Sequence, residues 1–129
     1  MFTIEKIENA HKKVKSGADF PKYIEEIKKF GVLSFETWTR DSHTVYYGKD
    51  NYTAQSQPQY EVLMVSKVSN IENFTFELKK HQKGETNYFE FCKNCAENGI
   101  EKWIVDLEEM KCIYFDMSGN EILTEMIPY

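Results

Sequence analysis

Apolar residues recur along this chain at helical spacing in some stretches and in strand-like runs in others, and the order of these stretches predicts the fold. The first half begins with two helical stretches, residues 4–14 and 20–30. Thr3 and Asp19 stand where they can cap these helices, and Gly31 supplies the left-handed residue that commonly ends a helix. We therefore predict two consecutive helices before any strand.

Three strand-like runs follow in the first half. Residues 32–39 and 43–48 are rich in β-forming side chains and are separated by a short polar turn, residues 40–42, which predicts a hairpin. A polar stretch, residues 48–59, then precedes an apolar run at residues 60–66, which predicts a third strand. The first half therefore reads helix, helix, strand, strand, strand.

The second half repeats this order. Asn70 and Asn87 are expected to cap two further helices, the second with Glu90 in a capping box, and Gly84 and Gly99 are expected to end them. The remaining strand-like runs cover residues 100–107, 111–116 and 121–127.

A single shift of 68 residues aligns the two halves over two helices and two strands. Glu61 aligns with Glu121 at a shift of 60 instead, which requires eight extra residues in the first half. We interpret the chain as a single domain, residues 1–129, that contains two pseudo-repeats of an αα-βββ unit, about 1–69 and 70–129. The predicted fold class is α+β, an antiparallel sheet with helices packed on one face.

Composition and charge limit the kinds of binding partner and the cellular compartment that we expect. The 129 residues are 41% hydrophobic and 29% charged, which is typical of a folded globular protein. The net charge of −5 and the presence of one arginine disfavour non-specific binding to nucleic acid. The sequence shows neither a membrane-spanning apolar run nor a secretion signal, and three cysteines suit a reducing compartment. We expect a cytoplasmic protein without nucleic-acid or membrane partners.

Cys92 and Cys95 form a Cys-x-x-Cys motif whose chemistry can be judged from the repeat. The shift of 68 places them on Ile24 and Ile27, which are expected core positions. A structural zinc site needs four ligands, and the remaining cysteine, Cys112, lies in a predicted strand. A redox pair usually lies at a helix N-terminus, whereas Cys92 is expected inside its helix. We predict packed thiols, with no metal and no cofactor.

The candidate binding residues lie where the two halves differ, around the turn of the first hairpin. They are Trp38, Arg40, His43, Tyr46 and Tyr47. A guanidinium, an imidazole and phenol groups beside a polar loop could bind a carboxylate or a phosphate group. The same residue types also suit a solvated hairpin turn, so both interpretations stay open.

Motifs of known enzymes give little support for catalysis. The sequence contains no phosphate-binding glycine loop, no nucleophile elbow, no zinc-protease motif and no paired-carboxylate signature. His11 and His81 occupy matching positions on the apolar faces of two predicted helices, which favours structural roles over catalytic ones.

Several short motifs carry a resemblance to a known family. They are HQKG at residues 81–84, FEFC at 89–92, KWIVD at 102–106 and YYG at 46–48. With them the chain resembles, nearly end to end, the YdfO-like family of small bacterial proteins, often encoded in prophages and sometimes labelled phage envelope protein. The resemblance implies a prophage-linked setting and carries over no catalytic residues. Cys95 departs from it, since a small apolar residue is usual there.

Two function hypotheses follow. The one we favour is a non-enzymatic binding module linked to phage or prophage biology that contacts a protein or a small ligand, with a homodimer through the uncovered sheet face as one arrangement. The alternative is an enzyme acting on a small anionic substrate through Arg40, His43 and Tyr46. That alternative requires the three side chains to converge in a pocket.

Overall fold

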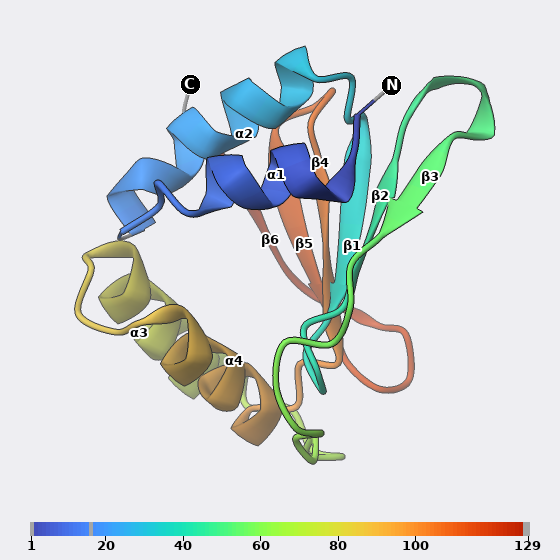
Figure 1. Ribbon diagram of the computed structural model, residues 1–129. Coiled ribbons are helices and arrows are strands. Elements are labelled where there is room, and N and C mark those ends of the chain that lie inside the picture. The colour runs from blue at the N-terminus through green and yellow to red at the C-terminus, as the bar shows by residue number, and fades with distance from the viewer. Residues whose placement is uncertain (1, 16, 128–129) are drawn as a thin grey trace.

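A computed structural model of the protein describes residues 2–15 and 17–127, and over these residues it shows four α-helices and a six-stranded antiparallel sheet (Figure 1). The predicted mixture of helices and antiparallel strands is confirmed. The helices are α1 (Ile4–His11), α2 (Phe20–Lys29), α3 (Ile71–Gln82) and α4 (Tyr88–Glu97). The strands are β1 (Ser34–Trp38), β2 (Thr44–Tyr47), β3 (Thr53–Gln55), β4 (Lys102–Asp106), β5 (Lys111–Phe115) and β6 (Glu121–Met126).

Side-chain caps define most of the helix starts. Thr3, Asn70 and Asn87 each accept a hydrogen bond from a backbone N–H in the first turn of the helix that follows, as predicted. The cap expected of Asp19 is wrong. Its carboxylate accepts a hydrogen bond from the backbone N–H of Lys15 and makes no capping bond to α2.

The sheet joins the two halves of the chain at its centre. Its strand order is β3-β2-β1-β4-β5-β6, so the first strands of the two halves, β1 and β4, lie side by side. In that antiparallel pair Glu36 lies opposite Ile104, the residue 68 positions further along the chain. The pairs on either side are symmetric about this one, which gives the sheet an approximate twofold axis between β1 and β4.

The third strand of the first half is not where the sequence pattern predicted it. Residues 60–66 form no strand, and β3 is formed by the polar residues Thr53–Gln55, which pair with β2. The shift of 68 therefore relates Thr53 to Glu121 at the start of β6, and no insertion precedes β3.

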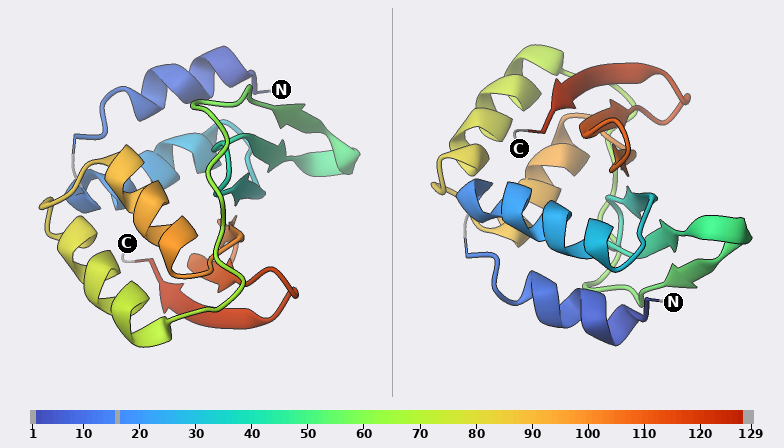
Figure 2. Two further views of the ribbon diagram at one scale, coloured as in Figure 1. Left: turned by 90° about the horizontal axis from the view of Figure 1, so that it is seen from below. Right: turned by 90° about the horizontal axis from the view of Figure 1, so that it is seen from above.

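Residues 56–70 form a strap that runs from β3 to α3 (Figure 2). The backbone N–H of Leu63 bonds to the carbonyl of Arg40 at 2.7 Å, and the backbone N–H of Ser66 bonds to the carbonyl of Ala96 at 2.8 Å. These bonds attach the strap to the turn of the β1–β2 hairpin (residues 39–43) and to the end of α4. The strap, which contains the apolar run at residues 60–66, thus connects the first half of the chain to the second.

Both helical pairs lie on the same side of the sheet (Figure 2), where alternate residues of the strands are buried. Cys92 and Cys95 belong to this core and are fully buried, so their predicted packing role is confirmed. Burial raises the pKa of Cys92 to about 11, which keeps its thiol protonated. Over the residues that the structure describes, no three His, Cys, Asp or Glu side chains gather as metal ligands.

No helix in the segments that the structure describes is both long enough and apolar enough to cross a lipid bilayer.

Candidate functional site

A cavity of about 180 Å³ lies between the first helical pair and the sheet. Its lining comes from α1, α2, β1, β2 and β4, from the hairpin turn and the strap, and from the first residue of α4. Seven of its fourteen lining residues carry a ring and seven carry a hydroxyl group, with the tyrosines in both sets. The cavity therefore combines apolar walls with several hydrogen-bonding groups.

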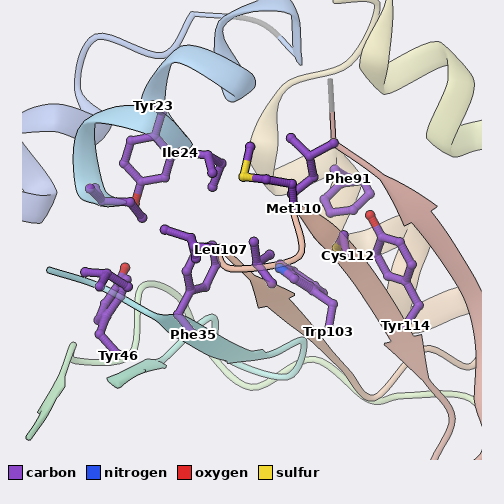
Figure 3. Packing of buried hydrophobic residues seen from close by; sticks show 14 of the residues in the cluster. Tyr23, Ile24, Phe35, Tyr46, Phe91, Trp103, Leu107, Met110, Cys112 and Tyr114 are labelled. Carbon is purple, nitrogen blue, oxygen red and sulfur yellow. The ribbon is translucent and has the colours of Figure 1, made fainter. Parts of the chain in front are cut away.

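Tyr23 of α2 and Tyr46 of β2 extend toward each other across this space (Figure 3). Both residues are buried. Burial is the main cause that raises the pKa of each phenol, and the neighbouring Tyr46 adds to the rise at Tyr23. Both hydroxyl groups therefore stay protonated at neutral pH, where each can donate and accept a hydrogen bond.

Thr37 and Thr44 lie opposite each other in the β1–β2 pair and place their hydroxyl groups at the floor of the cavity. Their Oγ1 atoms are 2.8 Å apart, and both side chains are buried. Because one hydroxyl must donate to the other, the second keeps its own hydrogen for another acceptor. Hydrogen bonds from Tyr23 and then from Thr44 lower the pKa of Tyr46 and offset part of the effect of burial.

His11 and Tyr88 form one wall of the cavity. The His11 ring meets the rings of Tyr23 and Tyr88 edge-on, with centroids 5.2 and 5.9 Å away. Partial burial lowers the pKa of His11 below 6.5, so the imidazole is neutral at pH 7. The Tyr88 hydroxyl lies 2.6 Å from Oγ of Ser42 and so joins the start of α4 to the hairpin turn.

Tyr88 is enclosed only at its hydroxyl end. The residue as a whole remains 37% exposed, yet burial around the hydroxyl raises its pKa well above 10. Its phenol is therefore a neutral hydrogen-bonding group, and its ring forms part of the cavity mouth.

The structure separates the residues that the sequence suggested as a site. Tyr46 lines the cavity, whereas Trp38 and His43 stack on each other with centroids 4.8 Å apart, and Trp38 alternates with the inward-facing residues of β1. Nδ1 of His43 lies 2.6 Å from Oδ1 of Asp41, and Nε of Arg40 lies 4.0 Å from Oδ2 of the same carboxylate. Arg40 and His43 thus meet at Asp41 and do not meet Tyr46.

Tyr47 lies on the outer face of the sheet, next to Tyr46 in the chain, and is exposed. On the same face the ammonium group of Lys102 bonds to Glu36 at 2.9 Å and lies 5.6 Å from the centre of the Trp38 ring. An ion pair and a ring contact therefore occupy the middle of the uncovered face. The homodimer through this face stays a prediction.

Sequence reasoning missed most of the cavity, although the chain carries a signal for it. Thr37 and Thr44 are polar residues directed toward the core, and the shift of 68 places them on Val105 and Cys112. Tyr23 differs from its counterpart in the same way, by a hydroxyl group. The differences between the halves that mark the cavity thus include inward-facing positions of the helices and strands.

Residues 8–126 match the family described as "Protein of unknown function (DUF1398)", and the chain therefore belongs to this family. A search of curated proteins gives no match. The family match does not test the YdfO-like resemblance or the prophage association, and both stay predictions.

Proposed function

We propose that this member of the DUF1398 family is a binding module that encloses a small molecule in the cavity between α1, α2 and the sheet. The observation that carries the proposal is the lining, in which aromatic walls surround the hydroxyl groups of Thr37, Thr44, Tyr23 and Tyr46. Ligand sites in proteins are typically concave and mostly apolar, with a few polar groups that orient the ligand.

The size of the cavity limits the ligand. An apolar cavity of about 150 Å³ accommodates benzene, so a space of about 180 Å³ suits a ligand of about one ring in size. The hydroxyl groups supply both donors and acceptors, which favours a ligand with at least one polar atom.

The same residues support binding more than catalysis. The Ser42 hydroxyl is paired with the Tyr88 phenol, and the phenols of Tyr23 and Tyr46 have raised pKa values, so at neutral pH they are poor bases. The alternative enzyme, with Arg40, His43 and Tyr46 acting together, gains no support because Tyr46 faces the cavity and the other two meet at Asp41.

Three further predictions belong to this proposal. The symmetric pairing of β1 with β4 supports descent of both halves from one αα-βββ unit. The YdfO-like resemblance supports a prophage-linked setting, and the three free, buried cysteines suit the reducing environment of the cytoplasm.

A ligand screen by NMR tests the proposal. We would add neutral, cationic and anionic compounds of one-ring size to ¹⁵N-labelled protein and follow the amide signals. The expected hits shift residues around Thr37 and Tyr46, and their affinity falls in Tyr46→Phe. Tyr114→Phe is the matched control, because Tyr114 is the buried tyrosine 68 positions after Tyr46 and lies outside the cavity lining. Shifts confined to Trp38 and Tyr47, or no shifts at all, would contradict the proposal.

A further inference from the structure

We infer that the ligand of this cavity is a small organic cation, such as a substituted ammonium ion. This inference rests on the proposed function, because it names the class of ligand that the same site takes.

The charge of the lining is the first observation. Among the fourteen lining residues Glu8 is the one acid, and none is a lysine or an arginine. The imidazole of His11 adds no positive charge at pH 7, since burial lowers its pKa. The carboxylate of Glu8 acts on the cavity floor, because it contributes to the raised pKa of Tyr46. The electrostatic potential inside the cavity therefore favours positive charge.

The aromatic lining is the second observation. Figure 3 shows Tyr23, Phe35 and Tyr46 extending toward one space from α2, β1 and β2. The face of an aromatic ring attracts a cation that lies within about 6 Å of its centroid, and substituted ammonium ions are bound in this way between several rings. Oxygen lone pairs of the hydroxyl groups of Thr37 and Thr44 at the floor add further attraction for a positive charge.

An anion would lose hydration in this cavity without gaining a positive partner. The hydroxyl groups of Thr37 and Thr44 could donate to a carboxylate, but neutral donors alone do not offset the removal of a charge from water. The carboxylate of Glu8 would repel the anion as well. The cavity thus discriminates against the anionic ligands that the sequence suggested for the hairpin turn.

The partial charges at the helix ends around the cavity do not reverse the sign of its electrostatic potential. The C-terminal end of α1 at His11 and the N-terminal end of α2 at Phe20 both reach the cavity. Each helix end acts as about half a charge, of opposite sign at the two ends, so these two largely cancel. The N-terminal end of α4 at Tyr88 carries the acidic side chain of Glu90 in its capping box, which offsets its positive end.

Three probes of similar shape and different charge test the inference. We would titrate tetramethylammonium, tert-butanol and trimethylacetate into the labelled protein at constant ionic strength and obtain Kd values from the shifts of cavity residues. The expected order is tetramethylammonium tightest by about tenfold, then tert-butanol, with trimethylacetate weakest. Glu8→Gln should weaken tetramethylammonium about threefold to fivefold and leave tert-butanol unchanged, because Glu8 lies at the exposed rim. Glu5→Gln, on the same helix but outside the lining, is the matched control and should change neither Kd.

The outcomes separate this inference from the proposed function. If tert-butanol or trimethylacetate binds in the cavity as tightly as tetramethylammonium, the cation inference is overturned and the binding cavity stands. If Glu5→Gln weakens the cation as much as Glu8→Gln, the preference comes from the net charge of the protein, and the inference is again overturned. If none of the three probes shifts the cavity residues, both the inference and the proposed function fail.

Discussion

The spaces beneath the two helical pairs occupy equivalent positions in the fold but differ in content. In the first space, between α1, α2 and the β1–β2 pair, Thr37 and Thr44 lie opposite each other and border the cavity. In the second space, between α3, α4 and the β4–β5 pair, Val105 and Cys112 lie opposite each other in the same register and are buried in the hydrophobic core.

The aromatic residues differ in the same sense. The first space has Tyr23 where the second has Phe91, whose ring packs on His81 at a centroid distance of 4.5 Å and on Trp103 at 5.4 Å. Rings pack on one another in both spaces, but only in the first does a tyrosine at this position add a hydroxyl group, which lies at the cavity. Both halves contribute to the hydrophobic core, but the cavity lies beneath the first helical pair, and this difference supports the proposed site.

The glycines that end α2 and α4 allow the largest effect to be tested. Gly31 and Gly99 both have positive φ, but a Cβ on Gly99 would lie 2.7 Å from Cα of Ser69 in the strap, whereas the nearest atom to a Cβ on Gly31 is 4.0 Å away. We expect Gly31→Ala to cost about 1–2 kcal/mol of unfolding free energy from backbone strain. Gly99→Ala should cost about 3 kcal/mol or more, because the strap must also move.

Urea unfolding of the two variants measures this difference. Equal losses of free energy in Gly31→Ala and Gly99→Ala would show that the strap does not press on the end of α4.

Substitutions that exchange threonine and valine between the equivalent strand pairs should give the next largest effect on the free energy of unfolding. Val105→Thr places a hydroxyl group in the second space opposite Cys112, and burial of a poorly bonded hydroxyl should cost about 1–3 kcal/mol. The double variant Thr37→Val with Thr44→Val removes both partners of one hydrogen bond, and Tyr46, which also bonds to Thr44, keeps Tyr23 as a partner, so the free energy of unfolding should change by no more than about 1 kcal/mol.

Thermal or urea unfolding measures the free energies of unfolding of these variants. Ligand titration then measures the affinity of the double variant for the cavity ligand. The double variant should remain folded and lose affinity for the cavity ligand. A double variant as destabilised as Val105→Thr would contradict the view that the first space tolerates apolar residues.

The histidines of the two halves should give the smallest effect, a dependence of stability on pH. Burial lowers the pKa of both His11 and His81 in the folded protein, while a hydrogen bond that the His81 ring donates to the backbone carbonyl of Thr86 offsets part of the shift at His81. The unfolded state, with a histidine pKa near 6.5, therefore takes up protons first as the pH falls. The contribution of the two neutral histidines to the free energy of unfolding is fully present above about pH 6.5. It is lost as the pH falls through their pKa values in the folded protein.

Midpoints of thermal unfolding between pH 7.5 and 5 measure this loss. His11→Gln and His81→Gln should each remove part of the pH dependence, because burial lowers the pKa of both histidines. The full pH dependence in both variants would contradict the assignment.

Most of the fold could be predicted because periodic apolar residues, caps and glycines agree along most of the chain. The third strand could not, since Thr53–Gln55 is short and polar and owes its conformation to pairing with β2. Residues 60–66 looked like a strand because they are apolar, but Leu63 packs on the core while Met64 is 92% exposed. Pattern alone cannot tell such a strap from a strand.

The candidate site was predicted less well for a different physical reason. Trp38 and Tyr46 lie on opposite faces of the sheet, but the suggested site combined them because of their chemistry. The cavity depends on how closely α1 and α2 approach the sheet, and no local sequence motif predicts that distance. The inward-facing Thr37 and Thr44, compared with Val105 and Cys112, were the usable signal.

The most direct test of the central claim is ¹⁹F NMR of protein labelled with 3-fluorotyrosine, with each signal assigned by a Tyr→Phe substitution, during titration with tetramethylammonium and other one-ring-sized compounds. If the first space is the binding site, the signals of Tyr23 and Tyr46 shift with a common Kd while those of Tyr114 and Tyr47 stay unchanged. Signals that shift first at Tyr114 or Tyr47, or four signals that never move, would contradict the account.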